Sequence, residues 1–276
     1  MFILGRQQRE FLGREVIPRL DKSVVPLFIN SHHGEPEAIG SGTLIDVSGR
    51  CFLITAAHVL DSPADQPIYF ILGNQTPAVC ISDLPIAQSK MPLGGWLKDV
   101  HCVDIAVCEI PVGVLGTEGL IHPWPATCLA PGIIHHAERH SFAVVGFPIS
   151  WCKATRYNRP MNYNFTIKAK PFSARLVGAM PEKYQATGFK RERNLLLKYE
   201  QLTDLATGIK RAPPKLYGVS GGAVWRLPSS RVASHYQCQL MAIVTNIDQE
   251  NKCVIAISVL FVRRLLRKCF GVEISQ

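Results

Sequence analysis

One serine in the sequence stands among residues that have almost no side chains. Ser220 lies in "LYGVSGGAVW", residues 216–225, with Gly218 two positions before it and Gly221 and Gly222 directly after it. Glycine reaches backbone angles that other residues avoid, so this stretch can be a turn. Glycine also lets a substrate carbonyl come close and leaves backbone N–H groups to bind a developing oxyanion. Ser220 is therefore a candidate nucleophile, although Gly-x-Ser-x-Gly alone does not exclude the turn.

A serine hydroxyl needs a base to accept its proton and an acid to hold that base in place. His58 ends the apolar run of "FLITAAHVL", which places an imidazole just beyond a predicted strand. Asp104 opens "DIAVCEI", and a carboxylate at the start of a buried strand is costly without a partner. His58 can instead be a core histidine, and Asp104 can cap a turn. In the order His, Asp, Ser, the three residues form a candidate catalytic triad.

The elements that would position these residues are mainly strands. Runs rich in β-branched and aromatic residues, such as "VVPLFIN", "CFLITAA" and "CQLMAIVTN", are separated by Gly, Pro, Asn and Asp. This pattern predicts an all-β sandwich or barrel. Helical spacing is confined to residues 5–20, where Pro18 limits the helix near its end, and to about residues 259–270. A Pro-rich break at 121–132 suggests three parts: a helical extension over 1–23, a first β-lobe over 24–120 and a second over 121–276.

Composition and charge are those of a globular protein with basic patches. The 276 residues are 47% hydrophobic and 18% charged, and 30 Lys and Arg outnumber 21 Asp and Glu to give a net charge of +9. The excess gathers in "GFKRER" at 188–193 and "RRLLRK" at 263–268. Such patches can bind nucleic acid or an acidic protein, but they are more often solvated faces.

The expected location and the expected absence of a metal follow from sequence signals that are not found. We read no secretory signal in "MFILGRQQRE", and the longest apolar run is too short to cross a bilayer. The nine cysteines are odd in number and lack zinc-site spacing. We therefore expect reduced thiols, a cytoplasmic location, and neither a membrane partner nor a metal or cofactor.

The motifs together resemble the trypsin/chymotrypsin-like serine peptidases, in particular bacterial single-domain trypsin-like and HtrA-like proteases, here without a PDZ extension. The similarity covers about residues 24–268. It rests on "GSGTLIDVSGRCFLITAAHVL" at 40–60, "DIAVCEI" at 104–110, "VVGFP" at 144–148, "GVSGGAVW" at 218–225 and "LMAIVTN" at 240–246. The resemblance implies two antiparallel six-stranded β-barrels with the active site between them, which agrees with the two lobes expected above.

The resemblance also implies a role for each matching position. Ser220 matches the nucleophile, His58 the general base and acid, and Asp104 the residue that orients the imidazole. The backbone N–H groups of Gly218 and Ser220 match the oxyanion hole. The strand that pairs with the substrate backbone in this family is matched by Thr245 and Asn246.

The specificity pocket departs from the trypsin pattern. Pro214 stands six residues before Ser220, where trypsin-like enzymes carry the aspartate that selects Lys or Arg. Cys253 aligns with a pocket wall, which indicates a small or apolar P1 residue. Asp248 lies in a loop that can reach the pocket, so a basic P1 residue stays open.

Two functions follow as expectations. The first is a serine endopeptidase that cleaves a protein or peptide through an acyl-enzyme, with a regulatory protein as a further partner. The second is a catalytically silent module of the same fold that binds a protein or a nucleic acid through its basic patches, because fold and function can separate.

Overall fold

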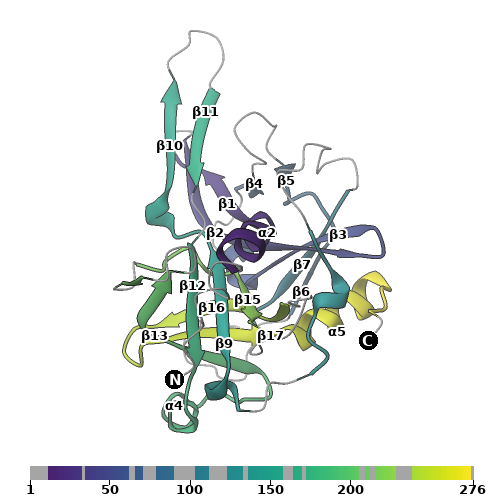
Figure 1. The fold of residues 1–276 in the computed structure, drawn as a ribbon. Coiled ribbons are helices and arrows are strands. Elements are labelled where there is room, and N and C mark those ends of the chain that lie inside the picture. The colour runs from purple at the N-terminus through teal and green to yellow at the C-terminus, as the bar shows by residue number, and fades with distance from the viewer. Residues whose placement is uncertain are drawn as a thin grey trace.

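The computed structural model describes residues 12–32, 35–61, 66–70, 79–89, 103–111, 123–132, 136–157, 164–169, 172–204, 209–211, 215–227 and 238–274. Two β-lobes make up most of this chain, the first at the upper right and the second at the lower left of the ribbon (Figure 1). None of the helices in these residues has the length and apolar character that crossing a bilayer requires.

The first lobe is a curved sheet with the strand order β5-β4-β1-β2-β3-β7-β6. These strands pair antiparallel, whereas the short β8 pairs parallel with β2. Within the described residues the outer strands β5 and β6 do not pair, so this lobe is an open half-barrel. The strands are β1 (Val24–Asn30), β2 (Pro36–Val47), β3 (Arg50–Thr55), β4 (Tyr69–Phe70), β5 (Val79–Cys80), β6 (Ile86–Gln88), β7 (Ala106–Ile110) and β8 (Trp124–Pro125).

The second lobe is a closed six-stranded barrel. Its strands follow the order β12-β9-β15-β16-β17-β13, and pairing of β12 with β13 closes the ring, while β14 adds to β13 outside it. A separate hairpin of β10 and β11 projects from the body (Figure 1). These strands are β9 (Ser141–Gly146), β10 (Cys152–Tyr157), β11 (Asn164–Ala169), β12 (Phe172–Gly178), β13 (Asn194–Asp204), β14 (Lys210–Arg211), β15 (Ala223–Arg226), β16 (Gln239–Asp248) and β17 (Cys253–Ser258).

The expected all-β fold of two antiparallel lobes with a helix at each end is confirmed. The N-terminal helix differs in one respect: Pro18 lies in the first turn of α2, where its missing N–H has no partner to lose, and the helix runs on to Lys22. The closing helix α5 spans Val259–Phe270, as its apolar spacing predicts. The other helices are η1 (Leu12–Val16), α3 (Ala57–Asp61), η2 (Ala126–Cys128), η3 (Ala137–Arg139), η4 (Ile149–Trp151) and α4 (Pro181–Thr187).

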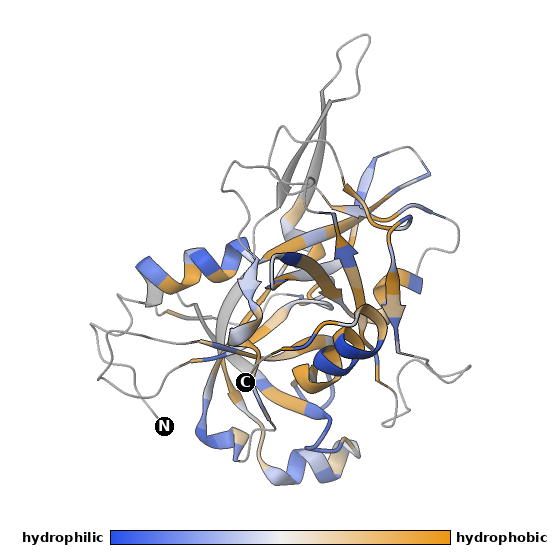
Figure 2. Cartoon of the chain, turned by 90° about the vertical axis from the view of Figure 1, so that its right-hand side faces the viewer, coloured by the Kyte–Doolittle hydropathy of each residue, from blue (hydrophilic) through white to orange (hydrophobic). Residues whose placement is uncertain are grey.

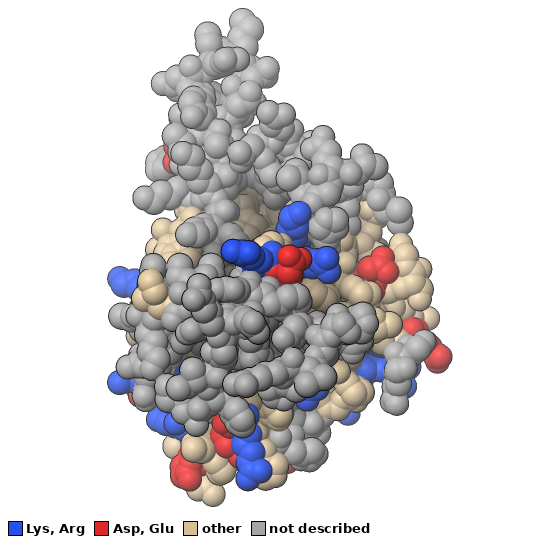
Figure 3. Space-filling model, viewed as in Figure 1, with Lys and Arg blue, Asp and Glu red and all other residues tan. Residues whose placement is uncertain are grey.

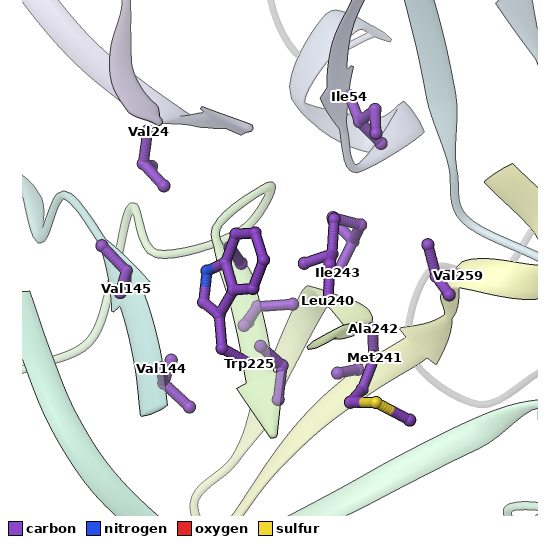
Figure 4. Close-up of a cluster of buried hydrophobic side chains, with 14 of the residues drawn as sticks. Val24, Ile54, Val144, Val145, Trp225, Leu240, Met241, Ala242, Ile243 and Val259 are labelled. Atoms are coloured by element: carbon purple, nitrogen blue, oxygen red, sulfur yellow. The ribbon is translucent and has the colours of Figure 1, made fainter. Parts of the chain in front are cut away.

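The middle of strand β3, residues 51–54, is apolar without interruption because both of its faces are buried. Successive side chains of a strand point to opposite faces. On β3 the side chain of Leu53 belongs to the interior of the first lobe, whereas Phe52 and Ile54 belong to a core that continues into the second lobe. Both faces of the strand are therefore buried, and "CFLIT" has no solvent side. Figure 4 shows Ile54 and Val24 on the first lobe's side of the core that surrounds Trp225.

The C-terminal helix is tied back to the first lobe by one arginine. Arg50 donates from Nε and Nη2 to the two carboxylate oxygens of Glu109, at 2.7 and 2.8 Å, and from Nη1 to the carbonyl of Phe270 at 3.0 Å. These hydrogen bonds from Arg50 hold the pKa of the Glu109 carboxyl below its usual value. The last carbonyl of α5 thus has a charged donor from a strand some distance away in the sequence.

Candidate active site

His58 and Asp104 are brought together by the pairing of two strands. β3 ends at Thr55, opposite Ala106 of β7, so the helix α3 that follows β3 lies beside the residues that precede β7. The carboxylate of Asp104 binds His58 twice: Oδ1 accepts from the backbone N–H at 2.9 Å, and Oδ2 lies 2.6 Å from Nδ1. This double contact fixes both the position of the residue and the orientation of its ring.

The contact also assigns the tautomer of the imidazole. A carboxylate 2.6 Å from Nδ1 requires a proton on that nitrogen, which leaves Nε2 as the nitrogen that can act as a base. The side chain of His58 keeps 28% of its surface exposed, compared with 17% for Asp104. The imidazole is therefore accessible to a substrate, while the carboxylate is shielded behind it.

The loop around Ser220 presents two backbone donors that no described residue uses. Val219, Gly221 and Gly222 donate their N–H groups to Leu216, Val244 and Val219 respectively. The N–H groups of Gly218 and Ser220 donate to no acceptor among the described residues. Two such amides separated by one residue are the arrangement that binds an oxyanion.

Glycine is required in this loop by both conformation and space. Gly218 and Gly221 have φ angles of +90° and +87°, which side chains rarely allow. A Cβ on Gly221 would lie 1.8 Å from the carbonyl oxygen of Ser41 and 2.3 Å from Oγ1 of Thr55. The loop is thus pressed directly against the end of β3, the strand that leads to His58.

Ser220 lies close to the histidine helix through its backbone. A Cβ built on Gly40 would lie 2.6 Å from Cγ1 of Val59, the residue after His58, and 3.3 Å from the carbonyl oxygen of Ser220. The serine hydroxyl donates to the carbonyl of Thr245 at 3.2 Å, which is long for a hydroxyl donor and restrains the rotamer only weakly. The arrangement combines an alcohol, an oriented imidazole and two amide donors.

Sequence reasoning missed the residue that joins the two lobes at this point. Ser41 of β2 is fully buried, and its N–H donates to the carbonyl of Ser220 at 2.8 Å. Its hydroxyl donates to the carbonyl of Gly218 at 2.7 Å and accepts from the N–H of Phe147 at 2.8 Å. Thr43 adds a hydrogen bond from Oγ1 to the carbonyl of Gly221 at 2.9 Å. The available signal was "GSGT", in which small hydroxyl residues alternate with glycines.

The residues expected to bind substrate divide into two groups. Thr245 and Asn246 lie on β16, where a bulge between Val244 and Asn246 interrupts the pairing with β17. Asn246 is partly exposed, and the carbonyl of Thr245 receives the Ser220 hydroxyl, so this strand runs beside the serine. Cys253 is fully buried in a separate cluster with Tyr184 of α4 and offers no exposed surface to a ligand.

The two remaining positions of the predicted pocket give no support for a basic P1 residue. The carboxylate of Asp248 accepts from the backbone N–H of Asn251 and from its side-chain amide, both at 2.8 Å, so it is engaged within its own turn. Pro214 lies outside the described residues.

Comparisons with known proteins identify the fold. No protein-family model and no curated protein matches the sequence. Among solved structures, the chain is similar to a scabies mite inactivated protease paralogue (15% identity, TM-score 0.51, covering 91% of this chain and 97% of that one). It is also similar to human heparin binding protein (11%, 0.50, 94% and 96%) and to kallikrein-related peptidase 10 in complex with Zn²⁺ (13%, 0.52, 91% and 96%). The fold is that of the trypsin-like serine proteases.

Proposed function

We propose that this protein is a cytoplasmic serine endopeptidase in which His58, Asp104 and Ser220 form the catalytic triad. The observation that carries the proposal is the double contact of Asp104 with His58, at 2.9 and 2.6 Å, next to a serine loop with two available amide donors. A histidine that only fills a core does not need its tautomer fixed by a carboxylate. An ordinary turn does not need two amides without acceptors on either side of one bonded residue.

The proposed reaction uses each group once in each half of the cycle. Ser220 Oγ attacks the scissile carbonyl carbon while His58 Nε2 accepts the hydroxyl proton, and Asp104 stabilises the resulting imidazolium. The N–H groups of Gly218 and Ser220 bind the oxyanion, each contributing about 10²–10³ in rate. His58 then gives its proton to the leaving amine as the C–N bond breaks. Water, deprotonated by His58, attacks the acyl-enzyme, and Ser220 regains its proton as the acid product leaves.

Substrate binding is proposed to follow β16 and the surface beside the serine loop. The backbone of Thr245 and Asn246 would pair with an extended peptide, since β-strand addition supplies main-chain hydrogen bonds. Ile149 and Tyr217 are 39% and 62% exposed and are joined by a backbone hydrogen bond of 2.8 Å. The side chain of Ile149 lies against Gly218. These exposed apolar groups support a preference for apolar residues next to the scissile bond.

A fluorophosphonate probe tests the proposal. We expect covalent labelling of the wild-type chain at Ser220, located by mass spectrometry of the labelled peptide. Ser220→Ala abolishes the adduct, and Asp104→Asn slows labelling by about 10³–10⁴-fold because it permits the wrong tautomer. Ser23→Ala is the control, since it removes another serine hydroxyl, one that is fully buried and donates to the carbonyl of Leu20. Absence of any adduct in folded wild-type protein would reject the enzyme.

The alternative is a silent module of the same fold that binds a partner through its basic patches. It is favoured by two of the structural neighbours, one described as an inactivated protease paralogue and the other as a heparin binding protein. Affinity for a nucleic acid or an acidic protein that falls steeply with salt, in a chain that the probe does not label, would support this function.

A further inference from the structure

The C-terminal helix α5 forms one wall of a cavity that the proposed peptidase function does not use. The cavity has a volume of about 360 Å³ and lies between this helix and the segments at residues 131 and 272–274. Its apolar surface comes from Pro131, Leu260, Val272 and Ile274. Its charged surface comes from three arginines of the helix, Arg263, Arg264 and Arg267, and from Glu273.

Two of the three arginines are held in place by neighbouring groups. Arg263 donates from Nη1 to the carbonyl of Ala130 at 3.4 Å and from Nη2 to the carbonyl of Ile274 at 3.1 Å. It therefore connects the two segments that form the opposite wall. Arg264 packs over the ring of Phe261, with 5.1 Å between its guanidinium carbon and the ring centroid. Guanidinium groups that are ordered before a ligand arrives lose less conformational entropy when they bind it.

The cavity is positive because its arginines have no carboxylate partners among the described residues. Arg50, in contrast, is fully paired with Glu109. The described chain gives Arg263, Arg264 and Arg267 no ion pair, and Glu273 is the one acid on the cavity wall. Among the residues that are coloured in Figure 3, basic and acidic side chains are interspersed over the surface. Three positive charges around one cavity repel one another, and a bound anion would offset this repulsion by its attraction to all three.

The amphipathic character of the helix explains only part of this charge. α5, at the right of Figure 1 and facing the viewer in Figure 2, alternates apolar and hydrophilic residues. Arg267 and Lys268 lie in its last turn, where cations complement the helix dipole. Arg263 and Arg264 lie before that turn and gain little from the dipole, so the dipole does not account for their charge beside the cavity.

We propose that this cavity is a binding site for a small phosphorylated molecule. The planar guanidinium donates two parallel hydrogen bonds to phosphate oxygens, which makes arginine the residue suited to this anion. A volume of about 360 Å³ lies in the range of small-ligand pockets and accommodates a phosphate ester with a compact apolar group. Leu260 and Val272 supply the surface for that group. The site lies on α5, not on an element that carries the proposed triad, so its occupancy and the peptidase activity are separate questions.

Isothermal titration of the full chain with phenyl phosphate, inorganic phosphate and phenol tests the site and separates a phosphate ester from the free phosphate ion as its ligand. We expect phenyl phosphate to bind with 1:1 stoichiometry, inorganic phosphate to bind more weakly, and phenol to give no heat. Arg264→Gln and Arg267→Gln should each weaken phenyl phosphate binding by about 10-fold or more, since each removes charged hydrogen bonds. Neither residue belongs to the proposed catalytic machinery, so probe labelling of Ser220 should stay at the wild-type rate in both variants.

Lys268→Gln is the matched control because it removes one positive charge from the same helix but not from the cavity wall. A specific site predicts less than a twofold change in phenyl phosphate affinity for this variant. Equal weakening by Lys268→Gln and the two arginine variants would overturn the proposal in favour of a diffuse positive field. Absence of binding of both phosphates at millimolar concentration, or binding of an RNA oligomer alone, would overturn it as well.

Discussion

Ser41→Ala is the substitution that most directly tests how the nucleophile loop is held. The hydroxyl of Ser41 is the acceptor for the N–H of Phe147 and the donor to the carbonyl of Gly218. The Phe147 bond is buried, so its N–H loses its acceptor without access to water, at a cost of about 1–3 kcal/mol. The Gly218 carbonyl is only part-buried and can bind water, at a cost of about 1 kcal/mol. We expect unfolding free energy to fall by about 2–4 kcal/mol.

The effect on reactivity separates positioning from mere stability. Without the Ser41 hydroxyl the carbonyl of Gly218 is no longer held. The peptide between Gly218 and Val219 can then turn, and because it lies between the two donor amides its turning shifts them. We expect fluorophosphonate labelling to slow by about 10–100-fold, a fraction of the full loss of one donor. Urea unfolding measures the free energy of unfolding. A time course of probe labelling, under conditions where all variants are folded, measures the labelling rate.

Ser23→Ala supplies the comparison. Ser23 is equally buried, but the carbonyl of Leu20 that its hydroxyl binds also accepts the N–H of Ser23, so no group is left without a partner. This variant should lose about 1 kcal/mol and keep its labelling rate within about twofold. If Ser41→Ala labels as fast as Ser23→Ala, the reasoning that links the β2 hydroxyl to the oxyanion donors is refuted.

Three further predictions concern the loop, the α5 attachment and the thiols. Gly221→Ala should cost more than about 4 kcal/mol or prevent folding, because a Cβ would lie 1.8 Å from a backbone oxygen at a φ of +87°; a melting temperature near wild type would contradict this. Glu109→Gln should cost about 1 kcal/mol at pH 7. The carboxyl pKa is lowered in the folded state by Arg50, so this stabilisation is present above the ordinary carboxyl pKa and is lost as pH falls through the folded pKa; urea titrations should show the full difference at pH 7 and a shrinking difference as the pH is lowered below the ordinary carboxyl pKa. Of the described cysteines, the exposed Cys269 should react first with a disulfide reagent, whereas burial raises the pKa of Cys51 to about 12 and should keep it unreactive until unfolding; loss of the fast phase in Cys269→Ser checks this.

The fold could be predicted from the sequence because its local signals agree with one another. The alternation of apolar runs with Gly and Pro predicted strands, and the burial of both faces of β3 explains why its residues "CFLI" include no polar side chain. The closure of the second barrel could not be predicted from these local signals. The pairing of β12 with β13, which completes the second barrel, depends on strand twist and register, which single-residue patterns do not encode.

The candidate site was predictable where each residue has a distinctive chemical type. His58 and Asp104 were found because an imidazole and a carboxylate at strand ends need partners, and the structure joins them. Ser41 was missed because its function comes from a contact with residues 177 positions away, and small hydroxyl residues are common in strands. Cys253 was assigned to the pocket by a loose alignment, whereas its side chain packs against α4.

The position of Ser41 on the first lobe has a consequence for a chain that is cut into two fragments. A break between β7 and β8 would leave the imidazole and its carboxylate on one fragment and the alcohol with its amide donors on the other. The Ser41 hydroxyl, which orders the loop around Ser220, would remain with the first fragment. In the second fragment the nucleophile would therefore lie in a loop without that hydrogen bond. Neither half would react alone, and recovery of labelling upon mixing would report their reassociation directly, as in a split reporter.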